Sequence, residues 1–595
     1  MTVVQELTAL DNGVERAAER LLSLQHPDGW WKGELESNAT MIAEHLFLLH
    51  FLGLRDAATD RLLANELLAR RRDDGTWSIW FEGPADLSVT VEAYTALKLA
   101  GVDAGDATRD YIRRSGGVAK TRIFTRAFLA LIGQWPWRRL PHVPVELNLL
   151  PADGPLSVYD FACWARQTMV ALSVVEALQP VRPSAIDLSE IGGRRTQSSH
   201  PPRLSRVRRH AVRVAERWVR ERQEADGSWG GIQPPWVWSL VMLAALGHGF
   251  EDETFRRGLE GWEGFMVRDG DRLRPEACQS PVWDTALAVL ALRAACVRAD
   301  DPRLQAAGDW LLREEITVRG DWAIRRPQLS PGGWAFEFHN DLYPDVDDTA
   351  VVALALRELG LGDAAVRRGL DWMVGMQSRS GGWGSFDPDN EALWLYRLPI
   401  CDFGKVTDEP TADVTAHALE ALGQEDGYED SLAAGLDWLL AEQEGDGSWF
   451  GRWGVNHVYG TGAALPALEA CGVQPEHPSI RRALAWLDSV QQPSGGFGED
   501  IRSYDDPSWR GRGTATPSQT AWALLGYVSG GAAEALSTRR AAEYLLQVQR
   551  PDGDWDEQHY TGTGFPLDFM IRYHLYRLTF PLLALGRLRE RLNRA

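Results

Sequence analysis

The sequence predicts an all-α protein composed of two α/α barrels, and three features of the chain lead to this prediction. A Gln-x-x-x-Gly-x-Trp motif recurs at intervals of about 46 to 66 residues, a length that suits one pair of helices per repeat. Apolar stretches with helical periodicity flank the copies, and no convincing alternating pattern of a β-strand is found. Copies occur on both sides of residues 181–210, which favours two barrels over one long solenoid.

The recurring motif is predicted to be a structural staple between neighbouring helices. Its glycine supplies the positive-φ turn that ends a helix, while its tryptophan packs against the next unit and its glutamine bonds freed backbone groups. An alternative is a set of aromatic platforms that bind sugars. The copies start at Gln25, Gln223, Gln328, Gln377, Gln443, Gln491 and Gln549, with a degenerate copy at Arg71.

The helices after these turns share a polar start, as in the segments 347–350 (DDTA) and 413–416 (DVTA). An Asp, Ser or Thr directly before an apolar helix is typical of an N-cap. Because the start recurs in successive repeats, one helix of every pair should point the same way. A closed barrel would then gather these N-termini at one end.

The composition excludes several classes of protein. With 44% hydrophobic and 24% charged residues the chain is an ordinary globular one, and its net charge of −21 disfavours nucleic-acid binding. The five cysteines form no CxxC pair, so we expect neither a disulfide framework nor a cysteine zinc site. The N-terminal stretch is unlike a secretory signal, and no apolar run of about eighteen residues occurs. We therefore expect a cytoplasmic protein, with peripheral membrane attachment left open.

Three carboxylates lie within four residues at the start of a strongly apolar helix: Asp345, Asp347 and Asp348. Capping and the helix dipole alone would explain one or two acids there. Three go further, because like charges resist ionising together and one group tends to keep its proton. A protonated carboxyl that faces an apolar cavity would act as a Brønsted acid.

The same cluster offers oxygen ligands to a hard cation, so metal binding is an alternative. The chain has no second aspartate-rich helix, no phosphate-binding P-loop and no HExxH motif. We therefore predict no metal and no cofactor.

A histidine is predicted to join the acid cluster. Asp413 and His417 are four residues apart in the next repeat and hence share one helical face. Asp348 and Asp413 occupy corresponding positions in neighbouring repeats, so His417 can approach the acids from the side and orient one of them by a hydrogen bond. Taken alone, a histidine in an apolar helix is more often an ordinary core residue.

These motifs resemble those of the squalene–hopene cyclases, the class II triterpene cyclases. The resemblance covers nearly the whole chain and rests on the repeated turns and on the segments 280–284 (SPVWD), 343–350 (YPDVDDTA), 401–404 (CDFG), 447–456 (GSWFGRWGVN) and 560–566 (YTGTGFP). It implies two α/α barrels around a large apolar cavity. One barrel would comprise residues 1–17 and 279–595, and the other the inserted residues 18–278.

The resemblance also implies catalytic roles. Asp347 would protonate a terminal alkene, with support from the other two acids of the cluster. A histidine held by an aspartate would polarise the acid, and a tyrosine would orient that network. The implied catalytic set is Asp345, Asp347, Asp348, Asp413, His417 and Tyr459.

The walls of the implied cavity follow from the same resemblance. Aromatic faces stabilise carbocations without quenching them, although each such side chain alone would be an ordinary core residue. The matching residues are Trp164, Trp283, Phe336, Phe386, Trp453, Phe565, Phe569, Tyr573 and Tyr576, with Ile232 and Gln233 beside them. A polar patch of Glu44, Glu92 and Arg122 would end the reaction by proton loss or water capture; without the resemblance it would be a solvated helix face.

The sequence departs from the family at positions that bear on the product and on membrane contact. The departing cavity positions are Phe386, Ile400, His457 and Leu567. Residues 181–210, where relatives have part of a nonpolar surface that dips into the membrane, are polar and carry seven Arg against two acids. We expect an exposed, mobile loop here, whose arginines can engage anionic headgroups.

The expected function is proton-initiated, cofactor-free cyclisation of squalene to hopene or hopanol. Alternatives are a related cyclase for another polyprenoid, such as a sesquarterpene or an aryl-terpenoid, a glycan-active α/α toroid, and a non-catalytic helical-repeat protein. The expected partner is a polyprenoid substrate and not nucleic acid. Peripheral (monotopic) contact with the inner face of the cell membrane and a homodimer are further expectations from the resemblance.

Overall fold

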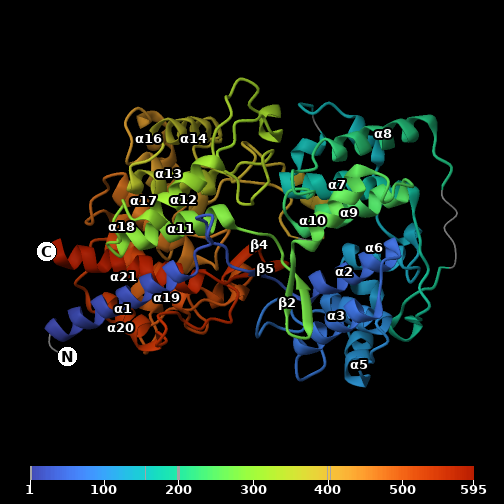
Figure 1. The fold of residues 1–595 in the computed structure, drawn as a ribbon, viewed down its shortest axis with the longest axis horizontal. Helices are drawn as coiled ribbons and strands as arrows, with labels where there is room; N and C mark the ends of the chain where they lie inside the picture. The colour runs from blue at the N-terminus through green and yellow to red at the C-terminus, as the bar shows by residue number, and fades with distance from the viewer. Residues whose placement is uncertain (1–2, 155, 197–201, 399, 403, 595) are drawn as a thin grey trace.

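Two groups of helices lie side by side, with the strands β4 and β5 between them (Figure 1). The computed structural model describes residues 3–154, 156–196, 202–398, 400–402 and 404–594, and helices dominate these residues. Each group of helices has its own hydrophobic core. The predicted fold class, an all-α protein with two α/α barrels, is confirmed.

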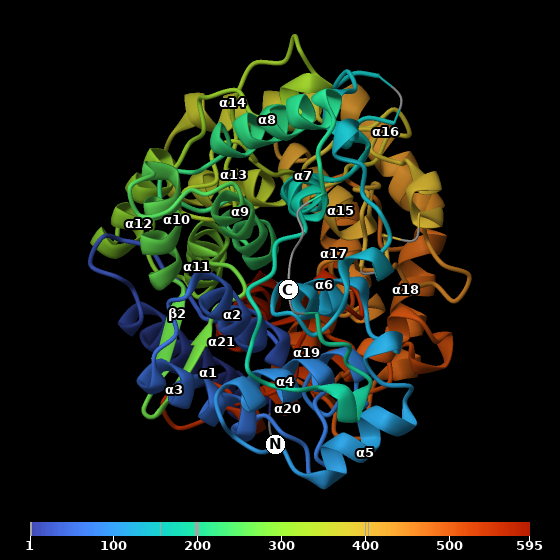
Figure 2. The same ribbon diagram turned by 90° about the vertical axis from the view of Figure 1, so that its right-hand side faces the viewer.

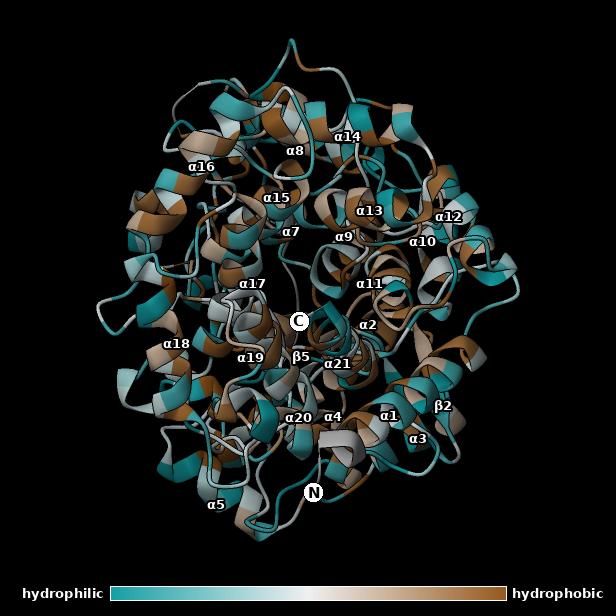
Figure 3. Ribbon diagram, turned by 90° about the vertical axis from the view of Figure 1, so that its left-hand side faces the viewer, coloured by the Kyte–Doolittle hydropathy of each residue, from teal (hydrophilic) through white to brown (hydrophobic). Residues whose placement is uncertain are grey.

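The C-terminal barrel is a closed ring of inner helices surrounded by outer ones. Each inner helix contacts the next, and the last returns to the first. The inner helices are α11 (Pro281–Ala294), α13 (Val346–Leu359), α15 (Ala412–Leu422), α17 (His457–Ala470), α19 (Pro517–Ser529) and α21 (Tyr576–Arg594). The outer helices are α1 (Val3–Ser23), α12 (Pro302–Arg313), α14 (Asp363–Gly375), α16 (Glu429–Ala441), α18 (Pro478–Val490) and α20 (Leu536–Val548). Figure 3 shows the two rings end-on, with apolar residues concentrated on the inner one.

The N-terminal barrel repeats this plan with its own inner and outer helices (Figure 2). Its inner helices are α2 (Ala39–Leu52), α4 (Leu87–Leu99), α6 (Ile123–Leu131), α7 (Cys163–Leu178) and α9 (Gln233–Ala245). Its outer helices are α3 (Ala57–Ala69), α5 (Asp106–Arg114), α8 (Arg206–Arg220) and α10 (Glu253–Glu263). Helix α1 packs on α11, α20 and α21, but the domain boundaries at 17/18 and 278/279 stay predictions.

Short 3-10 helices occupy many of the loops. They span Val118–Lys120, Trp137–Arg139, Val145–Leu149, Val158–Asp160, Ser189–Ile191, Asp321–Ile324, Leu393–Arg397, Ile501–Tyr504 and Pro507–Trp509. No helix of the described residues is long and apolar enough to cross a membrane.

The repeated motif is a staple, as predicted, and the sugar-platform alternative is wrong. Trp449 is fully buried, and its indole Nε1 donates to the carbonyl of Leu439 at 2.7 Å. Gln443 Nε2 donates to the carbonyls of Gly447 and Ser479. Gly447 has φ of 101°, in the left-handed region that favours glycine. Equivalent tryptophans are also fully or almost fully buried: Trp31, Trp77, Trp229, Trp334, Trp383 and Trp555.

The inner helices begin earlier than the sequence predicted. Asp345 caps α13, so Asp347 and Asp348 lie in its first turn and Thr349 is its fourth residue. The recurring threonine is therefore not a cap. Its Oγ accepts the backbone N–H of the preceding motif residue instead, as Thr349 does from Trp334 at 3.0 Å. This bond fixes each turn to the helix that follows it.

A small antiparallel sheet lies between the barrels and was missed by the sequence analysis. Strand β5 (Phe569–Tyr573) pairs with β1 (Leu35–Glu36) on one side and with β4 (Gly562–Phe565) on the other. A separate hairpin joins β2 (Met266–Asp269) to β3 (Arg272–Pro275). The central sheet ties the N-terminal segment to the end of the chain.

The segment 181–210 is less exposed than predicted. Arg182 and Ser184 donate backbone hydrogen bonds to the carbonyls of Leu131 and Ile132, and Leu188 and Ile191 are buried. Residues 206–210 begin helix α8, and residues 197–201 lie outside the described part of the chain. The apolar residues scattered through this basic stretch anchor its first half to the N-terminal barrel.

Candidate active site

A large apolar cavity lies between the barrels and contains about 970 Å³ of empty space. The first turns of inner helices α11, α13, α17 and α21 reach it, so the predicted gathering of N-termini at one end of the C-terminal barrel is confirmed. Strands β4 and β5 close one side of it.

The acid cluster sits at the head of this cavity. Asp345 Oδ1 accepts the backbone N–H of Asp348 at 2.7 Å, which is the cap of α13. Asp345 N–H donates in turn to the carbonyl of Trp334 at 2.9 Å. Asp345 and Asp348 are each 2% exposed, against 9% for Asp347. Of the three carboxyls, Asp347 therefore has the most open surface.

His417 contacts Asp347, as the repeat positions predicted. The distance from His417 Nδ1 to Asp347 Oδ1 is 2.9 Å. Burial alone would lower the pKa of His417, but the charge and hydrogen bond of Asp347 outweigh it and raise the pKa. Asp347 thus favours the protonated form of the imidazole.

Asp413 accepts hydrogen bonds from the backbone of a loop that contributes Trp453 to the cavity wall. Its Oδ2 accepts the backbone N–H groups of Arg452 and Trp453, at 2.9 and 2.7 Å. The expectation that Asp413 holds His417 by a hydrogen bond is replaced by this contact. Tyr459 approaches His417 through its ring, with the ring centroids 6.3 Å apart.

Burial dominates the titration of the two supporting acids. Together with the charge of Asp347, and against the hydrogen bonds from Asp348, it raises the pKa of Asp345 to about 8. Burial and then the charge of Asp345 raise the pKa of Asp348 well above the ordinary value. Asp284 of α11 is also buried, which raises its pKa to about 7. At neutral pH the interior of the cluster therefore keeps protons.

The predicted aromatic residues and Ile232 line the cavity together. Trp164 packs edge-on against Phe386 and Trp453, at centroid distances of 5.8 and 6.0 Å. Tyr573 and Tyr576 stack at 4.2 Å, and Trp283 Nε1 donates to the hydroxyl of Tyr576 at 3.0 Å. The wall comprises Trp164, Trp283, Phe336, Phe386, Trp453, Phe565, Phe569, Tyr573 and Tyr576. Among the described residues at the departing positions, Phe386 lines the cavity and Ile400, His457 and Leu567 do not.

The polar patch forms an adjoining cavity that shares Trp164, Ile232 and Phe569 with the main one. Its polar residues include Glu44, Glu92, Arg122 and Gln233. Both glutamates are buried, so the alternative of a solvated helix face is wrong.

The two glutamates of this patch differ in their hydrogen-bond partners and in the charges that act on them. Glu92 accepts hydrogen bonds from the hydroxyls of Thr40 and Thr125. Burial and then the charge of Glu92 raise the pKa of Glu44 well above its ordinary value. One glutamate of the pair is therefore favoured as a neutral acid beside a hydrogen-bonded carboxylate.

Three residues near the site escaped the sequence analysis. Trp522 packs on Tyr459 at 4.7 Å, and the Arg452 guanidinium lies over the Trp453 ring at 4.1 Å. Asp284 accepts hydrogen bonds from Gly33 N and Ser280 Oγ. Asp284 and Arg452 had a local signal, because they belong to the segments 280–284 and 447–456, whereas Trp522 had none.

A group with the geometry of metal ligands occurs away from the cavity. One ligand atom each of Glu34, Glu36 and His574 lies within 4.8 Å of the others. Glu36 is already paired with Arg70 and Arg572, while Glu34 is paired with Arg274. The arginines therefore already pair with the carboxylates that would have to coordinate a metal.

Two α/α barrels with a carboxyl cluster at the head of an aromatic-walled cavity define a terpene cyclase. A solved ent-copalyl diphosphate synthase from Streptomyces platensis shares the fold, with a TM-score of 0.54 at 19% identity over 96% of this chain and 99% of that one. Family models for the squalene-hopene cyclase C-terminal and N-terminal domains match residues 279–590 and residues 14–206 and 191–271. The chain belongs to the squalene-hopene cyclase family.

Three curated relatives match over nearly their whole length. A squalene–hopene cyclase of Alicyclobacillus acidocaldarius is 46% identical over 99% of both chains. A squalene–hopene cyclase of Zymomonas mobilis is 39% identical over 97% of this chain and 95% of its own. A dammaradiene synthase of Dryopteris crassirhizoma is 38% identical over 98% and 94%.

Proposed function

We propose that this protein cyclises squalene to the pentacyclic products hopene and hopanol, and that Asp347 starts the reaction by protonating a terminal alkene. The observation that carries the proposal is the contact between Asp347 and His417 at the head of a large aromatic-walled cavity. The names of the relatives support squalene as the substrate.

In the first step the carboxyl proton of Asp347 moves to the alkene, whose π electrons form the new C–H bond and leave a tertiary cation. His417 Nδ1–H donates to Oδ1 of Asp347, which places the carboxyl proton on Oδ2 and stabilises the carboxylate that remains. Asp345 and Asp348 stay neutral at pH 7 and so add no negative charge that would oppose proton loss.

The cation then needs stabilisation without a nucleophile. The faces of Trp164, Trp453 and the stacked Tyr573 and Tyr576 supply it, each worth about 0.5–2 kcal/mol in a desolvated site. The reaction ends at the patch of Glu44, Glu92 and Arg122. There the final cation either loses a proton to a carboxylate, directly or through a bound water, which gives hopene, or it is captured by a water molecule, which gives hopanol.

The direct test is to incubate the purified protein with squalene, shorter polyprenoids and aryl polyprenoids without added metal. Products are identified by gas chromatography with mass detection. We expect hopene and hopanol from squalene. Turnover of only a shorter or aryl-bearing polyprenoid would assign the chain to a related cyclase instead.

Peripheral attachment to the inner face of the membrane and a homodimer belong to the same proposal. Helix α8 carries arginines on a basic, amphipathic sequence, and Val207 and Leu156 are more than half exposed. We expect the protein to float with liposomes that contain anionic lipid and to sediment without them. Protein that stays in the soluble fraction throughout would exclude this attachment. Light scattering after size exclusion tests the dimer.

A further inference from the structure

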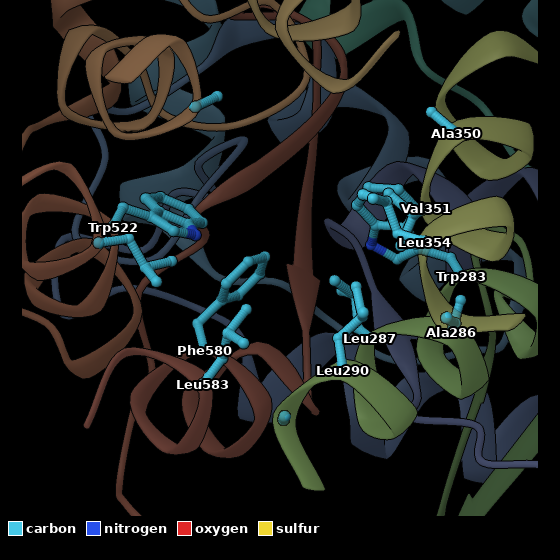
Figure 4. Packing of buried hydrophobic residues seen from close by; sticks show 14 of the residues in the cluster. Trp283, Ala286, Leu287, Leu290, Ala350, Val351, Leu354, Trp522, Phe580 and Leu583 are labelled. Atoms are coloured by element: carbon cyan, nitrogen blue, oxygen red, sulfur yellow. The ribbon is translucent and has the colours of Figure 1, made fainter. Parts of the chain in front are cut away.

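Tryptophans of the substrate cavity differ in how their indole rings are held. Trp164 Nε1 donates to the carbonyl of Lys405 at 2.8 Å. Trp283, which reaches into the interior of the C-terminal barrel in Figure 4, donates from Nε1 to the hydroxyl of Tyr576 at 3.0 Å. Trp453 Nε1 is buried and has no hydrogen-bond partner among the described residues. A different contact must therefore set the orientation of the Trp453 indole.

The backbone of Trp453 is fixed on both sides. Its N–H donates to Asp413 Oδ2 at 2.7 Å, at the start of α15. Its carbonyl accepts the N–H of Thr563 in β4 at 3.0 Å. The rings of Trp164 and Phe386 approach the indole nearly at right angles, at centroid distances of 6.0 and 6.4 Å. With the backbone held, only the side-chain torsions of Trp453 remain to be set.

The guanidinium of Arg452 packs on this indole. Its central carbon lies 4.1 Å from the centroid of the Trp453 ring and 5.6 Å from that of Trp164. A cation within about 6 Å of a ring centroid is attracted by the ring quadrupole, and the planar guanidinium also stacks on aromatic faces. Both indoles line the substrate cavity, whereas Arg452 does not. Each indole therefore contacts the cavity and the same buried cation.

Arg452 is itself held in a defined place. The residue is 4% exposed, and its Nη2 donates to the carbonyl of Gly564 at 2.9 Å. Its backbone N–H donates to Asp413 Oδ2 at 2.9 Å. Gly564 belongs to β4 and directly precedes Phe565 of the cavity wall. The guanidinium is thus fixed relative to both α15 and β4.

The charge of Arg452 has no counterion in direct contact. Within the described part of the chain its guanidinium forms no ion pair, and Asp408 and Asp413 act on it only through their charges. A buried cation without such a pair is costly, and an apolar side chain of similar size would avoid that cost. Its stabilising contacts are the Gly564 carbonyl and the two indoles. An apolar replacement would not stack on the indoles as a planar cation does.

We propose that Arg452 is a positioning residue for the cyclisation, which fixes the Trp453 indole at the angle that a late carbocation meets. This inference rests on the proposed function. Trp164, which contacts the same guanidinium, also lines the cavity of the polar patch where the reaction ends. A Trp453 ring that turned away would leave the cation less stabilised along this part of the wall. Proton loss from an earlier cation would then compete with closure of the last rings.

The first test is Arg452→Met, which keeps an unbranched side chain but removes the planar cation. We expect the share of incompletely cyclised products from squalene to rise about tenfold. The kcat should fall while KM stays within about twofold of the wild-type value, because the cavity still admits the substrate. Gas chromatography with mass detection gives the product shares. Arg502→Met is the matched control, since Arg502 lies over the ring of Trp509, 3.4 Å from its centroid and away from the cavity, and should leave the products unchanged.

A double-mutant cycle tests whether Arg452 acts through Trp453. Trp453→Leu removes the ring that is to be oriented. On that background Arg452→Met should change the product shares by less than about twofold, because two residues that act through one contact are not additive. Effects of the two substitutions that multiply in full would show that Arg452 acts elsewhere, and would overturn the proposal.

Arg452→Lys is the second variant and decides the matter if Arg452→Met does not fold. It keeps a buried charge and a donor for the Gly564 carbonyl but lacks the planar face. We expect a smaller shift toward incompletely cyclised products than with methionine. Wild-type product shares from either folded variant would overturn the proposal. A wild-type enzyme that gives no cyclic product at all would instead refute the proposed function.

Discussion

Asp347 differs from its two neighbours in exposure and in its partner. It has the largest exposed fraction of the three acids and contacts His417. Asp347→Asn should abolish cyclisation with no unfolding, because an amide accepts the same contact but has no acidic proton. Product formation and thermal unfolding are measured on the same preparation. Turnover above a hundredth of the wild-type rate would remove Asp347 from its role.

The pKa of Asp345, raised by burial to about 8, predicts the alkaline limit of activity. As the pH rises through about 8 this carboxyl ionises, and its charge makes Asp347 a weaker acid, so the rate should fall. The contribution of this group to folding stability should fall as the pH rises from about 4 to about 8 and then level off, because in that window the native state holds the proton that the unfolded state has lost.

Asp345→Asn keeps an oxygen acceptor for the cap of α13 but cannot ionise. The alkaline fall in rate should then move to higher pH or disappear. Because the acids of the cluster titrate as a coupled unit, the comparison uses complete pH profiles and not a single pH. An unchanged alkaline limb would show that another group sets the limit.

At the scale of the element, the stability of each repeat depends on the bond between a threonine and the motif backbone. Thr90 Oγ accepts the N–H of Trp77 at 3.1 Å, and both residues are buried. Thr90→Val keeps the shape but leaves that N–H unsatisfied, so the free energy of unfolding should drop by about 1–3 kcal/mol. Denaturant titration measures this drop. Thr317→Val, at an exposed threonine, is the control and should change stability by less than about 0.5 kcal/mol.

The inner helices and their staples could be predicted because their signals are local. The glycine, the tryptophan and the polar helix start recur together. The corresponding positions of Asp348 and Asp413 in neighbouring repeats also predicted that His417 would approach the acid cluster. The starts of the helices were misplaced, since Thr349 and its equivalents look like caps in sequence although they bond the previous turn. Strands β4 and β5 were missed because they are short and pair across the barrels.

At the scale of the whole molecule, a buried ionic cluster joins the two barrels. Arg166 of α7 is fully buried and donates to Asp321 Oδ2 at 2.9 Å and to Asp387 Oδ1 at 2.7 Å. Tyr343, two residues before the acid cluster, donates its hydroxyl to Asp321. This contact places the start of α13 relative to the N-terminal barrel. The sequence could not reveal it, because its partners are more than 150 residues apart.

Arg166→Met should destabilise the protein by about 3–5 kcal/mol, because it leaves the buried Asp387 without its cation and Asp321 with Arg222 alone. The free energy of unfolding is measured at neutral pH. Adding Asp387→Asn to Arg166→Met removes one uncompensated charge and should restore part of the loss. A single variant as stable as the wild type would show that the cluster does not join the barrels.

The substrate cavity also could be predicted only in part. Its aromatic residues followed from the family resemblance, while the contacts of Asp413 and the placement of Trp522 depend on how distant repeats pack. Of the described departing positions, Phe386 is the one that faces the cavity. We therefore expect product differences from relatives to arise there.

The central claim, that a protein carboxyl protonates the terminal alkene, is tested most directly by turnover of squalene in deuterated water. Mass spectrometry of the product should find one deuterium per molecule, located on the ring methylene carbon next to the geminal dimethyl carbon of the first ring. Unlabelled cyclic product from the wild-type enzyme, fully exchanged beforehand, would contradict the claim.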